Sequence, residues 1–459
     1  MIITVLAVAV ILYLALQFED KMKIPSPLGL IGLSFVSQAL FHNGIHVITN
    51  PEQFAELVLL LIPILLISDA MELKVCDLKE HGLSLFYLAV IAVAISVVVA
   101  IPAANLIFAG YHLSTAAIIS LFAMVLATDP VSVVSIFSNF EIPHKLKILA
   151  EGESLFNDAT ALIVFVFIGL FALEGGNITF GYVSEISLIV VLGSAILGIL
   201  VGFIGLVLLK TTENRTAELF LIILTGYGAF AAAEHFYSLV NLLGTHSHLH
   251  LSGILSCIAA TITVHHVMSR SMDRDDEIIE AEEVNIRQES RQARLSSNFL
   301  SNALGNINAT VEERARHMRS KEDIQLLAVV ANTILFIAMA EIIDLNLLMK
   351  YSREILGMFL VTTIIRGAMM AKFAVITNQT TRMTNVSFRW WGVLTFAGIK
   401  GGLSIVMLMM IPASFEYLEM FRAVVVGVIL LSTFVYSAIL IAIIGSNRQR
   451  FIDEKIMER

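Results

Sequence analysis

The feature that most constrains the fold of this 459-residue chain is a succession of apolar runs, each about as long as a helix that crosses a bilayer. Charged residues make up only 15% of the chain and the mean hydropathy is +0.85, values typical of proteins solvated by lipid. Lipid leaves backbone groups no partner outside the chain, so runs of this length predict an all-α polytopic membrane protein with about 13 transmembrane helices. We expect the spans at residues 2–18, 24–41, 54–73, 82–109, 113–139, 144–173, 183–209, 216–237, 249–268, 324–344, 351–375, 386–411 and 419–445.

Basic residues between these spans set the expected orientation. Lysines and arginines gather after the odd-numbered spans, for example at Lys74, Lys145 and Lys210, whereas the opposite loops hold few. Basic loops stay in the cytoplasm. The pattern therefore predicts a multi-pass protein of the plasma (inner) membrane, with its N-terminus outside and its C-terminus in the cytoplasm.

One long polar stretch interrupts the series of spans. We expect residues 1–268 to hold spans one to nine, 269–323 to be a cytoplasmic polar segment, 324–445 to hold spans ten to thirteen, and 446–459 to be a cytoplasmic tail. The mixed charges of the polar segment are typical of a solvated linker that is partly helical. Its length alone motivates the hypothesis that it regulates the membrane part.

The fifth expected span, which contains "LATDPVSV", carries a break. Pro130 has no backbone N–H, and its ring disfavours helical dihedrals at Asp129, so the helix should be interrupted around Thr128 to Pro130. A plain proline kink is the alternative. Freed backbone groups at membrane depth persist only where protein, water or an ion satisfies them, and the adjacent acid favours a functional break.

The twelfth expected span has a second break. Three glycines, Gly398, Gly401 and Gly402, surround Lys400 and weaken the helix locally. The second break lies seven spans after the first, and a shift by an odd number of spans reverses orientation in the membrane. The sequence therefore predicts two inverted six-helix repeats with paired unwound core helices, a pattern of transporters that bind their substrate at the midplane. The opposite charges of Asp129 and Lys400 suit the dipoles of the half-helices.

The stretch "EGESLFNDATALIVF", residues 151–165, places acids at the start of another apolar run. An apolar run follows Asp158 and so places it in the membrane interior, where an ionisable group indicates a functional site. Helical spacing puts Ser154 on the same face as Asp158. Near Asp129, repulsion between the two carboxylates favours a proton on one of them, whereas a small hard cation favours the ionised form. Cation and proton would then compete for one site, which is sufficient for exchange by alternating access.

Three further polar groups enter this prediction. Asn157 is neutral, so the site holds no second carboxylate for a second proton, which predicts electroneutral exchange. Glu72 ends the third span and could reach a cytoplasmic cavity leading to the site, although a plain interfacial acid fits equally well. Arg366, in the eleventh span, needs an anion, and Glu153 is the expected partner in a structural ion pair.

Together, "ATDPVSVVSIF", "EGESLFNDATALIVF", "HLHLSGIL", "TTIIRGAMM" and "AGIKGGLSIVM" resemble the monovalent cation:proton antiporters of the CPA1 type, in particular the prokaryotic sodium/proton antiporters of the NhaP kind. The resemblance covers nearly all the expected spans. It implies two inverted repeats joined by a linking span, a core domain with two crossing unwound helices, and a homodimer.

The resemblance also implies roles for individual residues. The cation and proton site of the family matches Asp158, Asp129, Thr128, Ser154 and Glu72 of this chain. The arginine that matches Arg366 pairs with the acid that matches Glu153, and the Asn157–Asp158 pair accompanies electroneutral exchange. This chain departs from the pattern at Lys400, where the family usually carries arginine.

These features predict a secondary antiporter that exchanges Na⁺, and also Li⁺, for H⁺ and so serves pH homeostasis. It would not be an enzyme and would use no cofactor, no metal beyond the transported cation, and no nucleic-acid partner. Exchange of K⁺ for H⁺ is the alternative, because selectivity depends on cavity size and coordination number. A cation channel is more remote, as is an intramembrane protease, since Ser404 and Ser154 have no embedded histidine partner.

Histidines offer two further hypotheses. His246, His248 and His250 alternate in "THSHLHLSG", but without an acidic or cysteine partner they make a weak metal site. His265 and His266, at the cytoplasmic end of the ninth span, could sense pH or simply cap a helix.

Overall fold

The computed structural model describes residues 2–22, 26–40, 51–238, 251–269, 297–342, 344–380 and 383–458. Every regular element in these ranges is a helix, which confirms the all-α fold. The first half contains α1 (Ile2–Met22), α2 (Ser26–Leu40), α3 (Pro51–Ala70), α4 (Val75–Phe86), η1 (Tyr87–Ile91), α5 (Ala92–Ile107), α6 (Thr115–Leu126), α7 (Pro130–Ser138), α8 (His144–Val164), η2 (Phe165–Leu170), α9 (Phe171–Leu173), α10 (Phe180–Leu209) and α11 (Arg215–Glu234). The second contains the helix Gly253–Ser269, α14 (Ser297–Ile342), α15 (Leu345–Lys350), α16 (Ser352–Gln379), α17 (Phe388–Phe396), α18 (Gly402–Met409), α19 (Leu418–Leu431), η3 (Ser432–Tyr436), α20 (Ser437–Ser446) and α21 (Arg448–Met457).

Within the described residues, seven helical stretches are long and apolar enough to cross a membrane. Two shorter apolar helices, Leu59–Ala70 and Gly253–Ser269, accompany them. The remaining expected spans fall on other helices, among them α17 and α18, which are short because the chain is interrupted between them. The long stretches are Val75–Ile107, Thr115–Ser138, His144–Leu173, Gly181–Leu209, Arg215–Glu234, Ser352–Gln379 and Leu418–Ser446.

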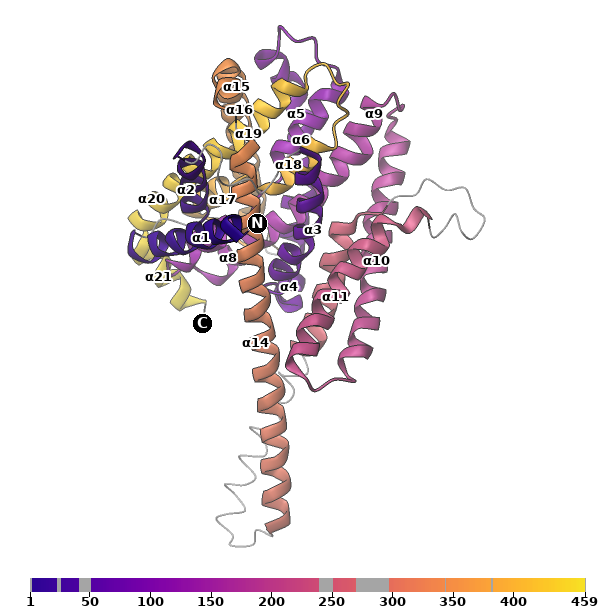
Figure 1. The fold of residues 1–459 in the computed structure, drawn as a ribbon, viewed down its shortest axis with the longest axis vertical. Coiled ribbons are helices and arrows are strands. Elements are labelled where there is room, and N and C mark those ends of the chain that lie inside the picture. The colour runs from indigo at the N-terminus through magenta and orange to yellow at the C-terminus, as the bar shows by residue number, and fades with distance from the viewer. Residues whose placement is uncertain are drawn as a thin grey trace. The chain divides into compact units, whose positions relative to one another are not determined.

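The chain forms two compact units. The first consists of Met1–Leu65, Cys76–Val191 and Val329–Arg459, and it contains both broken helices. Its centre is the interrupted stretch Thr115–Ser138, the most deeply buried of the seven candidate spans, and α6 packs against α8, α18 and α19 (Figure 1). The predicted site residues other than Glu72 all belong to this unit.

The second unit consists of Leu66–Val75 and Leu192–Ala328. Small residues let its helices approach closely: a Cβ on Gly202 of α10 would lie 2.9 Å from the carbonyl oxygen of Ala260 in the helix Gly253–Ser269. Contacts of this kind are typical of helix pairs in membranes, where van der Waals packing drives association.

A buried polar cluster joins the part of α14 that precedes Val329 to the rest of the second unit. Arg316 Nε donates to Glu218 Oε2 at 2.6 Å, and His317 Nδ1 lies 3.2 Å from Glu218 Oε1. His317 also stacks on His265, with 3.3 Å between His317 Nε2 and His265 Nδ1. His265 is thus part of a side-chain network rather than a helix cap. Its proposed pH sensing stays a prediction.

The long helix α14 is continuous from Ser297 to Ile342 (Figure 1). The expected boundary between the polar segment 269–323 and the span 324–344 lies inside this helix, so polar and apolar parts share one axis. Residues 270–296 lie outside the described residues, as do His246, His248 and His250.

The C-terminal helix α21 and the residue after it pack against other helices of the first unit through two acids and one aromatic side chain. Glu454 accepts hydrogen bonds from Arg389 and from Trp390 Nε1, both in the first turn of α17. Glu458 Oε2 accepts from the His144 backbone N–H at 2.7 Å, at the start of α8, and Phe451 is fully buried. The end of the chain therefore contacts the two helices that lead to the predicted site.

Candidate functional site

The first broken helix separates into α6 and α7 at residues 127–129. Ala127 and Asp129 have extended backbones, and Pro130 is the first residue of α7, a position where its missing N–H costs nothing. Asp129 is the N-cap, and its Oδ1 accepts from the Val131 N–H at 3.2 Å. The break thus occurs where the sequence predicted it, because proline ends one half-helix and starts the next.

The second broken helix separates into α17 and α18 at residues 397–401, and it crosses the first. The Asp129 N–H donates to the Ile399 carbonyl oxygen at 2.7 Å, so the two unwound segments hydrogen-bond each other. A Cβ on Gly401 would lie 2.6 Å from the Asp129 Cβ, closer than such atoms approach in proteins. Glycine is therefore required at Gly401 for the segments to come this close, although its backbone conformation is an ordinary extended one.

Helix α8 places Asp158 at this crossing. Asp158 Oδ1 accepts from the Thr128 backbone N–H at 2.8 Å, and the residue is only 9% exposed. Asn157 Nδ2 donates to the Leu126 carbonyl oxygen at 2.9 Å and to Thr128 Oγ1 at 3.2 Å. Two adjacent side chains of α8 thus satisfy backbone groups that the break in the first helix frees.

Some polar oxygens near the crossing have no hydrogen-bond partner among the described residues. These buried oxygens are Ser154 Oγ and Asn157 Oδ1, both on α8, and Ser404 Oγ in the first turn of α18. Buried polar groups in proteins normally have partners, so these oxygens have free capacity to accept from water or to bind an ion. Hydroxyl, amide and carboxylate oxygens are the ligands that hard cations take.

Lys400 contacts the end of the opposite broken helix. Its Nζ lies 3.4 Å from the Leu126 carbonyl oxygen at the C-terminus of α6, where a cation offsets the helix dipole. The residue is 3% exposed. Lys400 therefore belongs to the crossing together with Asp129 and Asp158.

Arg366 and Glu153 form a bidentate pair beside the crossing. Arg366 donates from Nη1 to Glu153 Oε1 at 2.9 Å and from Nη2 to Glu153 Oε2 at 2.8 Å. The same guanidinium donates to the carbonyl oxygens of Leu394 and Thr395, each at 3.0 Å, in the last turn of α17. Arg366 thus joins α8 to α17 and also caps the half-helix that leads into the second break.

Glu72 lies in the second unit, in the turn that follows α3. Its Oε1 accepts from Gln325 Nε2 and lies 3.4 Å from Lys321 Nζ, both on α14. Glu72 thus connects the turn after α3 to α14 through a hydrogen bond and an ion pair. Its expected role as a cation ligand stays a prediction.

Sequence reasoning missed two serines. Ser132 Oγ donates to Asp129 Oδ2, and Ser432 Oγ accepts from the Lys400 backbone N–H at 3.1 Å. Ser132 could have been found from its position three residues after an N-cap acid. Ser432 gives no local signal, because only the packing of α19 and η3 brings it to Lys400.

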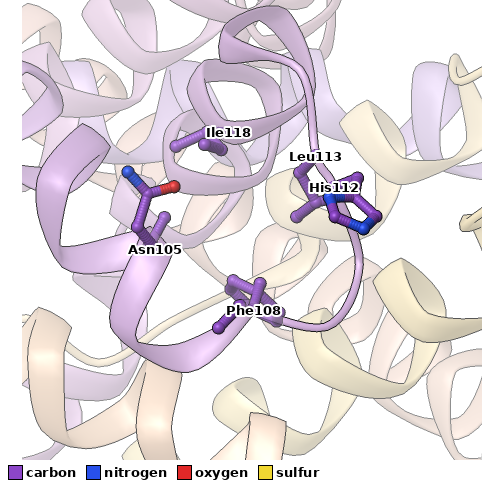
Figure 2. Close-up of a pocket in the computed structure, with 7 residues that line it drawn as sticks. Asn105, Phe108, His112, Leu113 and Ile118 are labelled. Atoms are coloured by element: carbon purple, nitrogen blue, oxygen red, sulfur yellow. The ribbon is translucent and has the colours of Figure 1, made fainter.

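A separate cavity of about 460 Å³ lies at the far end of α6 from the break. Figure 2 shows Asn105 and Ile118 on one side of it and His112 and Leu113 on the other. The predicted site residues are not among those that line it. Nearby, Tyr111 OH donates to Glu354 Oε1 at 2.8 Å, and burial together with this carboxylate raises the pKa of Tyr111 to about 12.

Two interrupted helices that cross within a set of membrane-length helices, with the carboxylates of Asp158 and Asp129 at the crossing, define the class of transporters with discontinuous helices. The family model described as "Sodium/hydrogen exchanger, transmembrane" matches residues 5–280. The chain belongs to this family, as the sequence motifs indicated. The matched residues include Asp129 and Asp158 and end before Arg366.

Individual relatives agree with this assignment. The Na(+)/H(+) antiporter NhaH of Halobacillus aidingensis is 30% identical over 46% of this chain and 51% of its own length, so the chain spans about half the length of that relative. The Na(+)/H(+) antiporter ApNhaP of Aphanothece halophytica is 24% identical over 94% of this chain and 71% of its own length. The structure of the sodium proton antiporter MjNhaP1 from Methanocaldococcus jannaschii shares the fold, with a TM-score of 0.66 at 16% identity over 94% of this chain and 97% of that one.

Proposed function

We propose that this protein is a secondary antiporter that exchanges Na⁺, and also Li⁺, for H⁺ across the membrane. The observation that carries the proposal is the crossing of the two broken helices, where Asp158 accepts the Thr128 N–H and Ser154 Oγ has no partner among the described residues. A carboxylate beside an unpartnered hydroxyl suits a small hard cation and also a proton. The names of the relatives, which are sodium/proton antiporters, support the same function.

The proposed mechanism is competition at this site. Asp158 holds either a proton or the cation, because binding of the cation favours the ionised carboxylate and protonation removes the charge that attracts the cation. If the broken-helix core reorients only when Asp158 holds a proton or a cation, each cation carried in one direction is exchanged for a proton carried in the other. Asn157, whose amide N–H groups bond Leu126 and Thr128, adds no second carboxylate, so the proposed exchange is electroneutral.

Asp129 supports the site in a different way from Asp158. Its carboxylate caps α7 and accepts from Ser132, so much of its hydrogen-bonding capacity is used within its own helix. Its negative charge remains beside the crossing, where it attracts the cation. We assign Thr128 and Glu72 as additional ligands and Lys400 as the charge that offsets the C-terminus of α6.

The remaining proposals concern the setting of the protein. We propose that it works as a homodimer in the plasma (inner) membrane, with its N-terminus outside and its C-terminus in the cytoplasm. The alternating basic loops support the orientation. Na⁺ is favoured over K⁺ because the relatives are named for Na⁺.

The test is dye-monitored proton movement in proteoliposomes under Na⁺, Li⁺ and K⁺ gradients. We expect Na⁺-driven movement by the unaltered chain, abolished by Asp158→Asn and by Asp129→Asn, while both variants remain folded. Asparagine is a good N-cap, so Asp129→Asn removes the charge and keeps the cap of α7. Asp77→Asn is the matched control, since Asp77 is a partly buried acid that pairs with His144 away from the crossing.

Three outcomes would contradict the proposal. Full exchange by Asp158→Asn would remove the carboxylate mechanism, and a response to K⁺ alone would replace Na⁺ as the substrate. Currents through single proteins in a planar bilayer would indicate a channel. Adding an ionophore that clamps the voltage tests electroneutrality, because an electroneutral exchanger keeps the same rate.

A further inference from the structure

One peptide unit in the second break connects two parts of the core. The peptide between Ile399 and Lys400 accepts from the Asp129 N–H through its carbonyl, at 2.7 Å, and donates through its N–H to Ser432 Oγ, at 3.1 Å. In a trans peptide these two groups point in opposite directions. Asp129 and Ser432 therefore hydrogen-bond the same planar peptide from opposite sides.

Ser432 is itself fixed in place. Its residue is fully buried, and its Oγ donates to the Ile429 carbonyl oxygen at 2.9 Å, one turn earlier in α19. With its proton engaged there, the hydroxyl presents a lone pair to the Lys400 N–H. The result is a continuous chain of hydrogen bonds from α19 through the peptide 399–400 to Asp129, and bonds in such a chain strengthen one another.

The same helix contacts the other end of the break. Tyr436, four residues after Ser432 in the π-helix η3, packs edge-on against Phe396, the last residue of α17, with ring centroids 5.5 Å apart. Its hydroxyl lies 2.7 Å from Thr363 Oγ1 in α16, one turn before Arg366. A single turn of π-helix inside an α-helix often marks a functional site. Here it accompanies contacts to both ends of the unwound segment.

We propose that Ser432 is a positioning residue for cation binding, which orients the 399–400 peptide and through it places Asp129 and Lys400 at the site. This inference rests on the proposed function, because the property that Ser432 would control is affinity for the transported cation. Without the serine hydroxyl, the Lys400 N–H has no acceptor in the interior of a membrane protein, and the peptide is free to rotate away from Asp129.

The neighbouring residue supplies a matched control. Thr433 Oγ1 donates to the same Ile429 carbonyl oxygen at 2.8 Å and its residue is 1% exposed, but the hydroxyl that accepts from the Lys400 N–H is that of Ser432. Ser432→Ala and Thr433→Val each remove one buried hydroxyl that bonds Ile429. Only Ser432→Ala also removes the acceptor of the Lys400 N–H.

The experiment measures Na⁺-dependent proton movement in proteoliposomes for both variants. We expect Ser432→Ala to raise the KM for Na⁺ about five-fold or more, the factor that corresponds to leaving one buried donor unpaired, with kcat close to that of the unaltered chain. Thr433→Val should leave KM within about two-fold. Ser432→Thr, which keeps the acceptor oxygen, should restore the KM. If Ser432→Ala does not fold, Ser432→Cys keeps the volume with a weaker acceptor and should raise KM by a smaller factor.

Hydrogen exchange provides a readout that does not depend on transport. The backbone amide of Lys400 should exchange faster in Ser432→Ala than in Thr433→Val. Equal KM values and equal exchange rates in the two variants would overturn the positioning role. An unaltered chain that moves no protons under any cation gradient would instead overturn the proposed function, and the exchange comparison would still decide whether Ser432 anchors the peptide.

Discussion

Individual residues at or beside the crossing bond several polar groups at once. Arg366 satisfies two carboxylate oxygens of Glu153 and two carbonyl oxygens at the end of α17. Asn157 similarly bonds both Leu126 and Thr128. Broken helices leave many polar groups without intrahelical partners, and side chains with several donors are an economical way to satisfy them inside a membrane.

Substitution of Arg366 tests this multiple role. Arg366→Gln should lower the free energy of unfolding by about 3–5 kcal/mol, because it leaves the Glu153 carboxylate buried without a counter-charge. Arg366→Lys keeps the charge, but three donors on one nitrogen cannot reproduce the planar arrangement, and we expect a loss of about 1–3 kcal/mol. A denaturant titration of each variant in detergent measures both losses of unfolding free energy. A lysine variant as stable as the unaltered chain would show that charge alone matters at this position.

At the scale of elements, the geometry of the site depends on how closely two unwound segments approach. The contact between Gly401 and Asp129 leaves no room for a side chain, whereas a Cβ on Gly402 would meet nothing closer than 3.7 Å. The two adjacent glycines therefore have different reasons to be present. Gly401 permits the crossing, and Gly402 begins α18.

We accordingly expect different results from the two alanine substitutions. Gly401→Ala should push α18 away from Asp129, at a cost of about 1–3 kcal/mol for overpacking, and should strongly reduce exchange. Gly402→Ala should change stability by less than about 0.5 kcal/mol, since its Cβ would meet Leu335 Cδ1 at an ordinary van der Waals distance of 3.7 Å and the position is helical. Thermal unfolding and the proteoliposome assay distinguish them. Equal behaviour of the two variants would contradict the assigned close contact.

At the scale of the whole molecule, contacts far apart in the sequence hold the first unit together. The C-terminal helix α21 contacts the first turn of α17 through Glu454 and the start of α8 through Glu458. Both of those helices lead into the crossing. The expected cytoplasmic tail, residues 446–459, thus contains a helix, Arg448–Met457, that packs within the first unit. Its cytoplasmic location stays a prediction.

A pair of neighbouring acids tests the attachment of this helix. Glu454→Ala removes the acceptor of Arg389 and Trp390, so we expect faster backbone hydrogen exchange throughout residues 448–457, by a factor of about five or more. Asp453→Ala is the control, because Asp453 contacts Gln449 within α21 itself. Similar exchange in both variants would contradict the role of Glu454 in holding the helix in place.

Much of the architecture follows directly from the sequence. Apolar runs of membrane length can only become helices, and Pro130 must interrupt one of them, so the all-α fold and the break at Thr128–Pro130 are consequences of local chemistry. The cost of an unpaired buried charge predicts that Arg366 has an acidic partner, and Glu153 is the expected one. The two side chains lie in bidentate contact.

Other features required the tertiary structure. Neither the bond between Asp129 and Ile399 nor that between Lys400 and Ser432 has a sequence signal, because each joins residues that only packing brings together. The same is true of Glu72, whose contacts with α14 place it in the second unit. The sequence determined which residues are charged, buried and helical, since these depend on composition and period. Which oxygen faces which proton was decided by the approach of separate helices, a property of the assembled molecule that no single segment specifies.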